Sequence, residues 1–181
     1  MRPYWEAMAI TPWRVDSLDQ WTEKALQRGA SCLVLRLAVP PSMDELWEWA
    51  RRWEDIPWIV HARWASQYIG YGMHFPAPPL PSHPKLPFSY LYGQSCHSLE
   101  EVAVAASWAS YVWIGPFFPT PSHPEQKGGY LPLEMLGLLR EKYPSLPVIA
   151  LGGIDTEERK AAVLKAGAWG FAGIRYFLEG K

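Results

Sequence analysis

The chain has 181 residues, of which 49% are hydrophobic and 19% are charged, and its formal net charge is −1. These values fit one globular domain over residues 1–181, and the absence of a Lys/Arg block argues against a protein that binds nucleic acid. Pro, Arg, Glu or Gly interrupts every apolar run before it could span a bilayer, so we expect a soluble, cytoplasmic protein without membrane contact.

Apolar runs alternate with helix signals along the chain. Runs typical of buried parallel strands lie at residues 7–11, 32–38, 58–62, 72–75, 91–96, 111–115, 148–151 and within 167–177. Start signals and apolar spacing predict helices at residues 17–28, 42–53, 98–109, 131–143 and 156–166, with a brief helical piece at 65–69. In the second helix, Leu46, Trp47, Ala50 and Trp53 lie at apolar positions, so Trp47 and Trp53 are expected either in the core or, where exposed, in a subunit interface.

Strands that alternate with helices are typical of a TIM-type (β/α)8 barrel, which is the α/β fold we predict. The barrel is small for this fold, since the whole chain has 181 residues. Little more than residues 176–181 remains after the last strand, so we expect a truncated final helix. Residues 76–84 are too rich in proline for a regular helix, so the helix after the fourth strand is expected to be short or missing.

The two cysteines, Cys32 and Cys96, lie far apart in the chain. They form no Cys-x-x-Cys motif, which argues against a zinc site or a redox pair. We expect both thiols to be small buried groups in strands.

The apolar run at residues 148–151 ends at Gly152 and Gly153, and a helix-start signal follows. Glycines let backbone amides approach a ligand closely, and amides at the start of a helix can hold a phosphate. In (β/α)8 barrels the loops after the seventh and eighth strands frequently form such a site. Adjacent glycines also occur in ordinary strand-to-helix turns, so phosphate binding and a structural turn are both open at this point.

Two further features mark the expected mouth of the barrel. Arg36 interrupts an apolar strand, and a buried charge is costly unless it is paired or faces a wet cavity. It is therefore expected either to pair with an acid or to point into the mouth, where it could bind an anion. The loop at residues 116–129 is long, and such loops are usually functional or disordered.

Three stretches resemble the thiamine phosphate synthase and TenI-like family. They are GQSCHSLEE at residues 93–101, YVWIGPFFPTPS at 111–122, and PVIALGGI at 147–154 with GAWGFA at 167–172. The resemblance implies a barrel that holds phosphate or pyrophosphate with the loop after strand six and with amides after strands seven and eight. The phosphate contacts that it implies are Thr120, Ser122, Gly152, Gly153 and the backbone of Ile174 and Arg175.

A synthase resembling this chain would hold magnesium with carboxylates that follow strands three and four, because pyrophosphate departure needs the metal. Residues 61–63 read His-Ala-Arg instead of Asn-Asp-Arg, and residues 75–79 contain no Asp. Ala38 and His123 stand where lysines are expected. Thiamine phosphate synthase activity therefore needs an altered magnesium site, and no cofactor is expected for the other functions considered.

The TenI-like branch includes a thiazole tautomerase, which moves a proton on a thiazole carboxylate phosphate without a metal. This chemistry needs an acid/base group with a pKa near neutral, for which histidine is the natural candidate. In that enzyme the catalytic histidine follows the glycine of strand six, where this chain has Pro116. The candidate catalytic residues here are His61, His123 and His74, and the candidate substrate contacts are Arg36 and Arg63.

Three of the histidines also have other roles open to them. His74 ends a strand and could be a core residue that hydrogen-bonds a backbone carbonyl. His123 lies on the loop after strand six and could close over a bound anion. His97 precedes the capping-box pattern of Ser98 and Glu101, so we expect it to help start a helix.

Three functions follow from the resemblance. The first is a TenI-like barrel that binds a phosphorylated thiazole and acts as a metal-free tautomerase, and the second is a thiamine phosphate synthase with an altered metal site. The third is a non-catalytic relative that binds a phosphate ligand or has a regulatory role. In each case the partner is a small phosphorylated heterocycle, and exposed tryptophans could form the interface of a homodimer.

Overall fold

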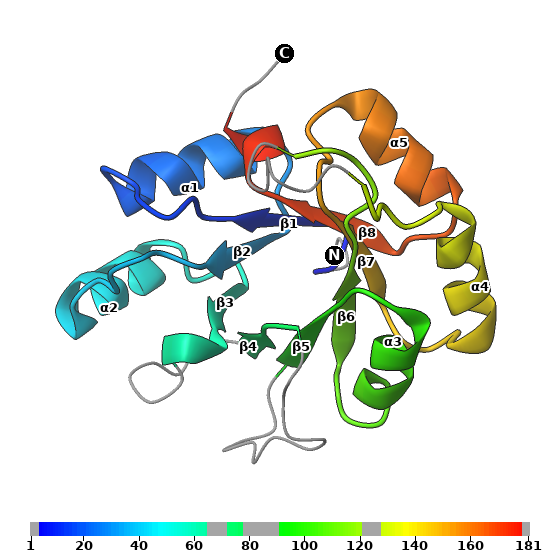
Figure 1. Ribbon diagram of the computed structural model, residues 1–181. Helices are drawn as coiled ribbons and strands as arrows, with labels where there is room; N and C mark the ends of the chain where they lie inside the picture. Colours follow the sequence, from blue (N-terminus) through cyan, green and yellow to red (C-terminus); the bar gives the residue numbers. More distant parts are fainter. Residues whose placement is uncertain (1–3, 65–71, 78–90, 121–127, 179–181) are drawn as a thin grey trace.

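Eight parallel strands close into a barrel, in which each strand pairs with the next and β8 pairs with β1 (Figure 1). The structure is a computed structural model that describes residues 4–64, 72–77, 91–120 and 128–178. The strands are β1 Ala7–Ile10, β2 Cys32–Leu35, β3 Trp58–His61, β4 Gly72–Phe75, β5 Leu91–Cys96, β6 Tyr111–Ile114, β7 Val148–Leu151 and β8 Gly170–Gly173. The predicted (β/α)8 barrel is confirmed.

Helices surround the barrel on its outer side (Figure 1). The α-helices are α1 Leu18–Gln27, α2 Met43–Arg52, α3 Leu99–Ala105, α4 Glu134–Lys142 and α5 Glu157–Lys165, and the 3-10 helices are η1 Ala62–Trp64 and η2 Arg175–Phe177. The short η2 follows β8, at the place where the final helix of the barrel would begin. The helical piece predicted at 65–69 and most of the proline-rich segment, residues 78–84, lie outside the described residues. None of the described helices is long and apolar enough to span a membrane.

The strands separate two hydrophobic layers because successive side chains point to opposite faces. In β1, Met8 and Ile10 belong to the inner cluster, which fills the barrel together with Tyr111 and Trp113 of β6. The alternate side chains, such as Ala9, belong to the larger cluster between the strands and the helices. Both cysteines are buried in strands, as predicted. The inner cluster forms the floor on which a site at the barrel mouth rests.

Three helices start at the predicted side chains. The Ser17 hydroxyl accepts a hydrogen bond from the Gln20 amide, and Thr156 caps α5 in the same way. Ser42 and Glu45 complete a capping box at α2, with both reciprocal bonds present. These local bonds satisfy amides that have no partner inside the helix.

The capping box predicted at Ser98 forms only in half. The Glu101 amide donates to the Ser98 hydroxyl at 3.2 Å, but the Glu101 carboxylate accepts from the amide of His97 at 2.6 Å, one residue earlier than expected. The helix predicted from residue 131 begins at Glu134 instead. The amide of Leu131 donates to the carbonyl of Pro116, which ties this residue to the loop after β6 rather than to a helix.

Two further boundaries and orientations differ from the prediction. β2 ends at Leu35, because the amide of Arg36 donates to the Thr11 hydroxyl at 2.7 Å rather than continuing the strand. In α2, Trp47 is 48% exposed, which excludes the core position considered for it, whereas Trp49 is buried. Trp49 donates its indole N–H to Thr22 of α1 at 2.9 Å, which fixes the buried face of α2.

Candidate active site

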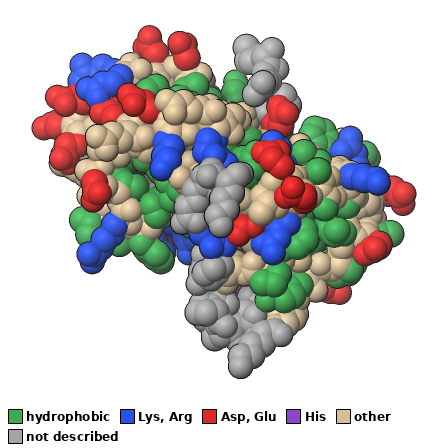
Figure 2. Space-filling view, turned by 90° about the horizontal axis from the view of Figure 1, so that it is seen from above, with side chains coloured by type: hydrophobic (Ala, Val, Ile, Leu, Met, Phe, Trp, Pro, Cys, Tyr) green, Lys and Arg blue, Asp and Glu red, His purple; other side chains and the backbone are tan. Residues whose placement is uncertain are grey.

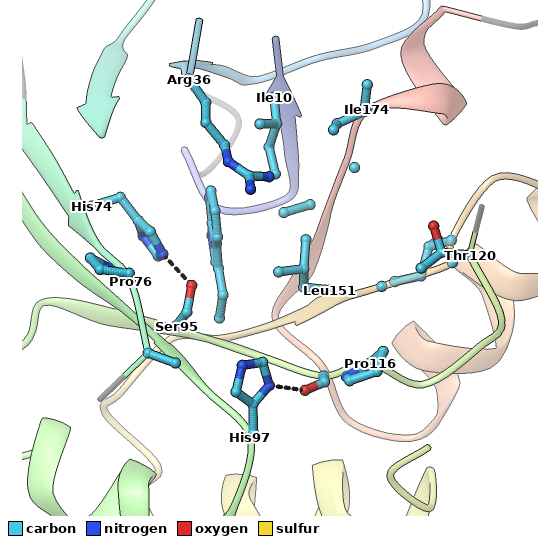
Figure 3. A pocket seen from close by; sticks show the side chains of 18 of the residues that line it. Ile10, Arg36, His74, Pro76, Ser95, His97, Pro116, Thr120, Leu151 and Ile174 are labelled. Carbon is cyan, nitrogen blue, oxygen red and sulfur yellow. Dashed lines mark hydrogen bonds between the residues drawn. The ribbon is translucent and has the colours of Figure 1, made fainter. Parts of the chain in front are cut away.

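A cavity of about 490 Å³ opens at the carboxyl ends of the strands, where active sites lie in this fold (Figure 3). Its lining includes Ile10 of β1, His74 of β4, Ser95 of β5 and Leu151 of β7. Acidic and basic side chains are interspersed on the face shown in Figure 2, so no single-sign field dominates that face. Several of the residues predicted for the site line this cavity, together with others that were not predicted.

The glycine turn after β7 forms one wall of this cavity. Gly152 and Gly153 have φ values of +95° and +70°, which residues with a Cβ rarely adopt. A Cβ on Gly153 would lie 2.4 Å from the carbonyl oxygen of Phe118, and one on Gly152 would lie 2.5 Å from the Pro116 side chain. Only glycine lets this turn lie directly against the loop that follows β6.

The predicted phosphate contacts that are described lie together in this cavity. Thr120, Gly152, Gly153, Ile174 and Arg175 all line it, and Figure 3 shows Thr120 and Ile174 on the same side of the pocket. We call this group the glycine cup. Ser122 and His123 lie outside the described residues. Residues from three separate loops thus converge where the sequence predicted an anion site.

A network of charged side chains supports the glycine cup. The Asp155 carboxylate pairs with Arg159 at 2.8 Å and with Arg175 at 2.9 Å. Arg159 also donates to the carbonyl of Gly153 at 2.7 Å, which holds the turn in place. Two guanidinium groups and one carboxylate leave one positive charge beside the cup, which favours an anionic ligand.

Arg36 supplies a second positive charge to the cavity. Figure 3 shows its side chain extending from the end of β2 into the pocket, beside Ile10. Among the described residues it has no acidic partner, so pointing into the mouth is the alternative that the structure favours. Burial, followed by repulsion from Arg63, lowers the pKa of Arg36. Its guanidinium lies 5.2 Å from the ring centre of Trp13.

Arg63 is placed differently from its prediction as a substrate contact. It is exposed and does not belong to the cavity lining. Its guanidinium lies 4.7 Å from the ring centre of Trp13, the same ring that Arg36 contacts. Arg63 therefore acts on the described cavity through its charge and through Trp13 rather than by lining it.

His61 lines the cavity and is neutral at pH 7. Burial, followed by the charges of Arg63 and Arg36, lowers its pKa to about 4. The amide of Arg63 donates to Nδ1 of His61 at 3.3 Å, so this nitrogen carries the lone pair. In the neutral ring the proton must then lie on Nε2, which makes His61 a hydrogen-bond donor.

His74 is fully buried, and its partners are hydroxyl groups rather than the backbone carbonyl considered from the sequence. Its Nδ1 lies 3.0 Å from the Tyr111 hydroxyl and its Nε2 lies 2.9 Å from the Ser95 hydroxyl. The ring stacks on Trp113, with 3.5 Å between the centroids. Burial holds the pKa of His74 well below its usual value, and repulsion from His61, once that ring is protonated, and from Arg36 lowers it further.

The buried Tyr111 hydroxyl determines which group donates in the hydrogen bonds that link Tyr111, His74 and Ser95. His74 is its hydrogen-bond partner among the described residues, and a buried O–H without an acceptor is costly. Tyr111 therefore donates to Nδ1 of His74, and Nε2–H of His74 donates to Ser95. The hydroxyl hydrogen of Ser95 remains available to a ligand, because Ser95 lines the cavity. Ser95 is a site residue that the sequence did not reveal.

His97 is the second site residue that the sequence did not assign. Its ring lines the cavity, and its Nδ1 lies 2.6 Å from the carbonyl oxygen of Gly115 (Figure 3). Its backbone amide binds Glu101 at the start of α3, so the expected role in helix initiation belongs to the backbone alone. The sequence offered one indication that His97 belongs to the site. It directly follows β5, and residues that follow barrel strands lie at the mouth of the barrel.

Because His74 is buried and neutral, we expect the protein to lose stability in mild acid. Above pH 6.5 neither the folded nor the unfolded chain protonates His74, whose ordinary pKa is 6.5. Below that pH the unfolded chain binds a proton that the folded chain excludes, so the free energy of unfolding falls by up to about 1.4 kcal/mol per pH unit. Urea unfolding of the protein and of His74→Gln between pH 7 and 5 measures this slope. If the free energy of unfolding falls equally steeply with pH in both proteins, His74 is not the buried neutral histidine that causes the loss.

Magnesium, which a synthase of this family would need, does not fit the described lining. Mg²⁺ prefers oxygen ligands, above all carboxylates. Asp155 is the carboxylate among the described lining residues, and both of its oxygens are held by guanidinium groups. The described residues also contain no cluster of three or more His, Cys, Asp or Glu side chains that could hold a metal.

The fold and the cavity together define a (β/α)8 barrel with a candidate active site at the carboxyl ends of its strands. The family model described as thiamine monophosphate synthase (TMP-TENI) matches residues 7–177. The chain belongs to this family, as the sequence motifs predicted.

Curated and solved relatives agree with this assignment. The chain is 38% identical over 111 residues to "Putative thiamine-phosphate synthase 2" of Aquifex aeolicus, a match that covers 60% of the chain and 58% of that protein. It is 42% identical over 83 residues to the thiamine-phosphate synthase of Anoxybacillus flavithermus, covering 45% of the chain and 37% of that protein. The matches thus span less than two thirds of either relative. The structure is similar to the thiamine phosphate pyrophosphorylase of Pyrococcus furiosus, with a TM-score of 0.70 and 25% identity over 94% of this chain and 86% of that one.

Proposed function

We propose that the cavity binds a thiazole that carries a phosphate and a carboxylate, and that the protein moves a proton on this ligand without a metal. The observation that carries the proposal is the chemistry of the lining. It combines the glycine cup, neutral histidines and the Arg36 cation, which has no acidic partner in the described part of the chain, in one cavity, whereas the described carboxylate of the lining is already paired. Such a site suits acid/base chemistry on an anionic ligand.

The two positive regions of the cavity suggest the orientation of the ligand. The phosphate would bind the backbone of Gly152 and Gly153, beside Thr120, where a net positive charge remains. The carboxylate would bind Arg36, whose guanidinium fork matches a carboxylate. The ring would lie near Ser95 and Trp113, which provide a hydroxyl donor and an aromatic surface.

Thiamine phosphate synthase activity is the second candidate, because the Aquifex, Anoxybacillus and Pyrococcus relatives carry that name or its synonym. It requires magnesium ligands that the described lining does not supply. A third possibility is a phosphate-binding protein without catalysis, since the ligand contacts do not depend on proton transfer. The three functions therefore predict different outcomes in the same assays.

One set of assays distinguishes them. The purified protein is incubated with the non-aromatic tautomer of thiazole carboxylate phosphate in deuterated buffer, and isomerisation and deuterium uptake are followed by NMR. Isomerisation without metal supports the proposal, and magnesium-dependent pyrophosphate release from the aminopyrimidine diphosphate supports the synthase. Saturable binding without turnover in either assay supports the binding protein, and failure to bind the thiazole ligand overturns the proposal.

The Arg36→Met substitution tests the predicted carboxylate contact. A hydrogen bond to a charged group contributes about 1.5–3 kcal/mol, so the Kd for thiazole carboxylate phosphate should rise by about tenfold or more. The Kd for the decarboxylated thiazole phosphate should change little, because that ligand lacks the group that Arg36 binds. Calorimetry with both ligands measures the difference. Equal losses for the two ligands would assign Arg36 to the phosphate instead.

A further inference from the structure

Hydrogen-bond partners distinguish the three described histidines that line the cavity. A backbone carbonyl can only accept a hydrogen bond, so the 2.6 Å contact with Gly115 requires that Nδ1 of His97 carries a proton. In the neutral ring, Nε2 of His97 is then the unprotonated nitrogen. Figure 3 shows the ring of His97 at the edge of the pocket, with this second nitrogen turned away from Gly115 towards the interior.

The other two rings have the opposite arrangement. Nδ1 of His61 accepts from the Arg63 amide, which leaves the proton on Nε2. Nδ1 of His74 accepts from Tyr111, and its Nε2–H is already bonded to Ser95. Both are therefore neutral donors, and neither offers a lone pair to the cavity. His97 differs from them in being exposed and in having, on the cavity side, a ring nitrogen without a hydrogen-bond partner among the residues that the structure describes.

From this pattern we infer that His97 is the base that takes the proton from the ligand, with His61 and Ser95 acting as hydrogen-bond donors to it. The inference rests on the proposed function and names the residue that would perform its chemistry. It reassigns the role that the sequence had given to His61, His74 or His123. The carbonyl of Gly115 orients the ring, much as a base in an active site is held by an acceptor on its other nitrogen.

The proton transfer is balanced without a further reactant. A C–H bond of the ligand breaks, its electron pair enters the conjugated ring system, and the proton forms an N–H bond at Nε2 of His97. The resulting imidazolium returns a proton to a second carbon of the same ligand, and Nε2 regains its lone pair. The negative charge that develops on the ligand is stabilised by the donors His61 and Ser95 and by Arg36.

His97→Asn is the most informative substitution. The amide nitrogen of Asn can take the place of Nδ1 and keep the bond to Gly115, but nothing replaces Nε2. General acid/base catalysis typically contributes a factor of about 10² to 10⁴, so we expect isomerisation and deuterium uptake to fall by about 100-fold or more. The Kd for thiazole carboxylate phosphate should change by less than about threefold, since the anion contacts remain. Glu100→Gln, on α3 but outside the cavity lining, is the control.

Two further measurements test the role of the ring itself. Free imidazole should restore part of the exchange in His97→Ala, because His97 is exposed at the cavity and the small base can occupy its place. In the unsubstituted protein without ligand, 15N NMR of the histidine rings should find the Nδ1–H tautomer at His97 and the Nε2–H tautomer at His61 and His74.

The possible results separate this inference from the proposed function. Unchanged isomerisation in His97→Asn, an Nε2–H tautomer at His97, or binding without any exchange in the unsubstituted protein would each overturn the assignment of His97 as the base. Failure of the unsubstituted protein to bind thiazole carboxylate phosphate would overturn the proposed function. In that event the tautomer measurement still decides whether His97 presents a free basic nitrogen to the cavity.

Discussion

Replacing Gly153 with alanine is expected to abolish measurable phosphate binding and to lower the free energy of unfolding by about 3 kcal/mol or more. The residue has φ +70°, and its new Cβ would lie 2.4 Å from the carbonyl oxygen of Phe118 and 2.6 Å from that of Pro119. Both contacts are with backbone, so the loop after β6 must move, and Thr120 moves with it. Calorimetric titration with thiazole carboxylate phosphate and urea unfolding measure the two effects.

Substitutions at two other glycines distinguish the cost of backbone strain from the cost of the steric clash in Gly153→Ala. Gly29→Ala combines φ +83° with no atom within 4 Å, so it should show the cost of the left-handed backbone alone, about 1–2 kcal/mol. Gly128→Ala has no positive φ and no atom within 4 Å, so it should be close to neutral in unfolding. If Gly153→Ala costs no more than Gly29→Ala, the glycine turn and the loop after β6 are not in contact as described.

Gly93→Ala is expected to produce the second large effect, in the interior of the barrel. A Cβ at this position would lie 2.0 Å from the ring of Tyr111, which is fully buried and cannot move without displacing its neighbours. Overpacking of a core typically costs about 1–3 kcal/mol and occasionally more. Tyr111 also orients His74 and, through it, Ser95, so ligand affinity should fall together with stability.

A double substitution tests whether the Tyr111 ring is the cause. Tyr111→Ala removes the ring and leaves a cavity, into which the methyl group of Gly93→Ala can fit. The double variant should therefore be more stable than the sum of the two single losses predicts, as expected for residues in direct contact. Additive losses in urea unfolding would show that Gly93 is constrained by something other than Tyr111.

The candidate site was predictable where local sequence dictates it. Gly152 and Gly153 follow an apolar run and precede a helix start, so a close-approach turn at a strand end could be deduced before the fold was known. The structure adds the loop carrying Thr120 and the turn at Ile174 to the same wall. Arg36 was likewise recognisable as a charge in an apolar strand, although the sequence left its partner open.

The roles of the histidines were not predictable in this way. His97 looked like part of a helix start, because Ser98 and Glu101 follow it, yet only its backbone amide serves that purpose. Its ring belongs to the site because β6 brings the Gly115 carbonyl within 2.6 Å of it. Arg63 shows the reverse case. The sequence predicted it as a substrate contact, whereas the structure places it in η1, exposed and outside the lining of the described cavity.

The sequence by itself determined the barrel, most strand and helix positions and the glycine turn, because these depend on residue periodicity and on backbone preferences within a few residues. Only the tertiary structure decided which nitrogen of His74 and of His97 carries the proton, whereas the tautomer of His61 depends on the nearby amide of Arg63. That choice depends on partners 18 residues away for His97 and 37 residues away for His74, which barrel closure brings into contact. The position of the proposed anion-binding wall therefore depends on local sequence, whereas the position of the proposed base depends on which strands become neighbours.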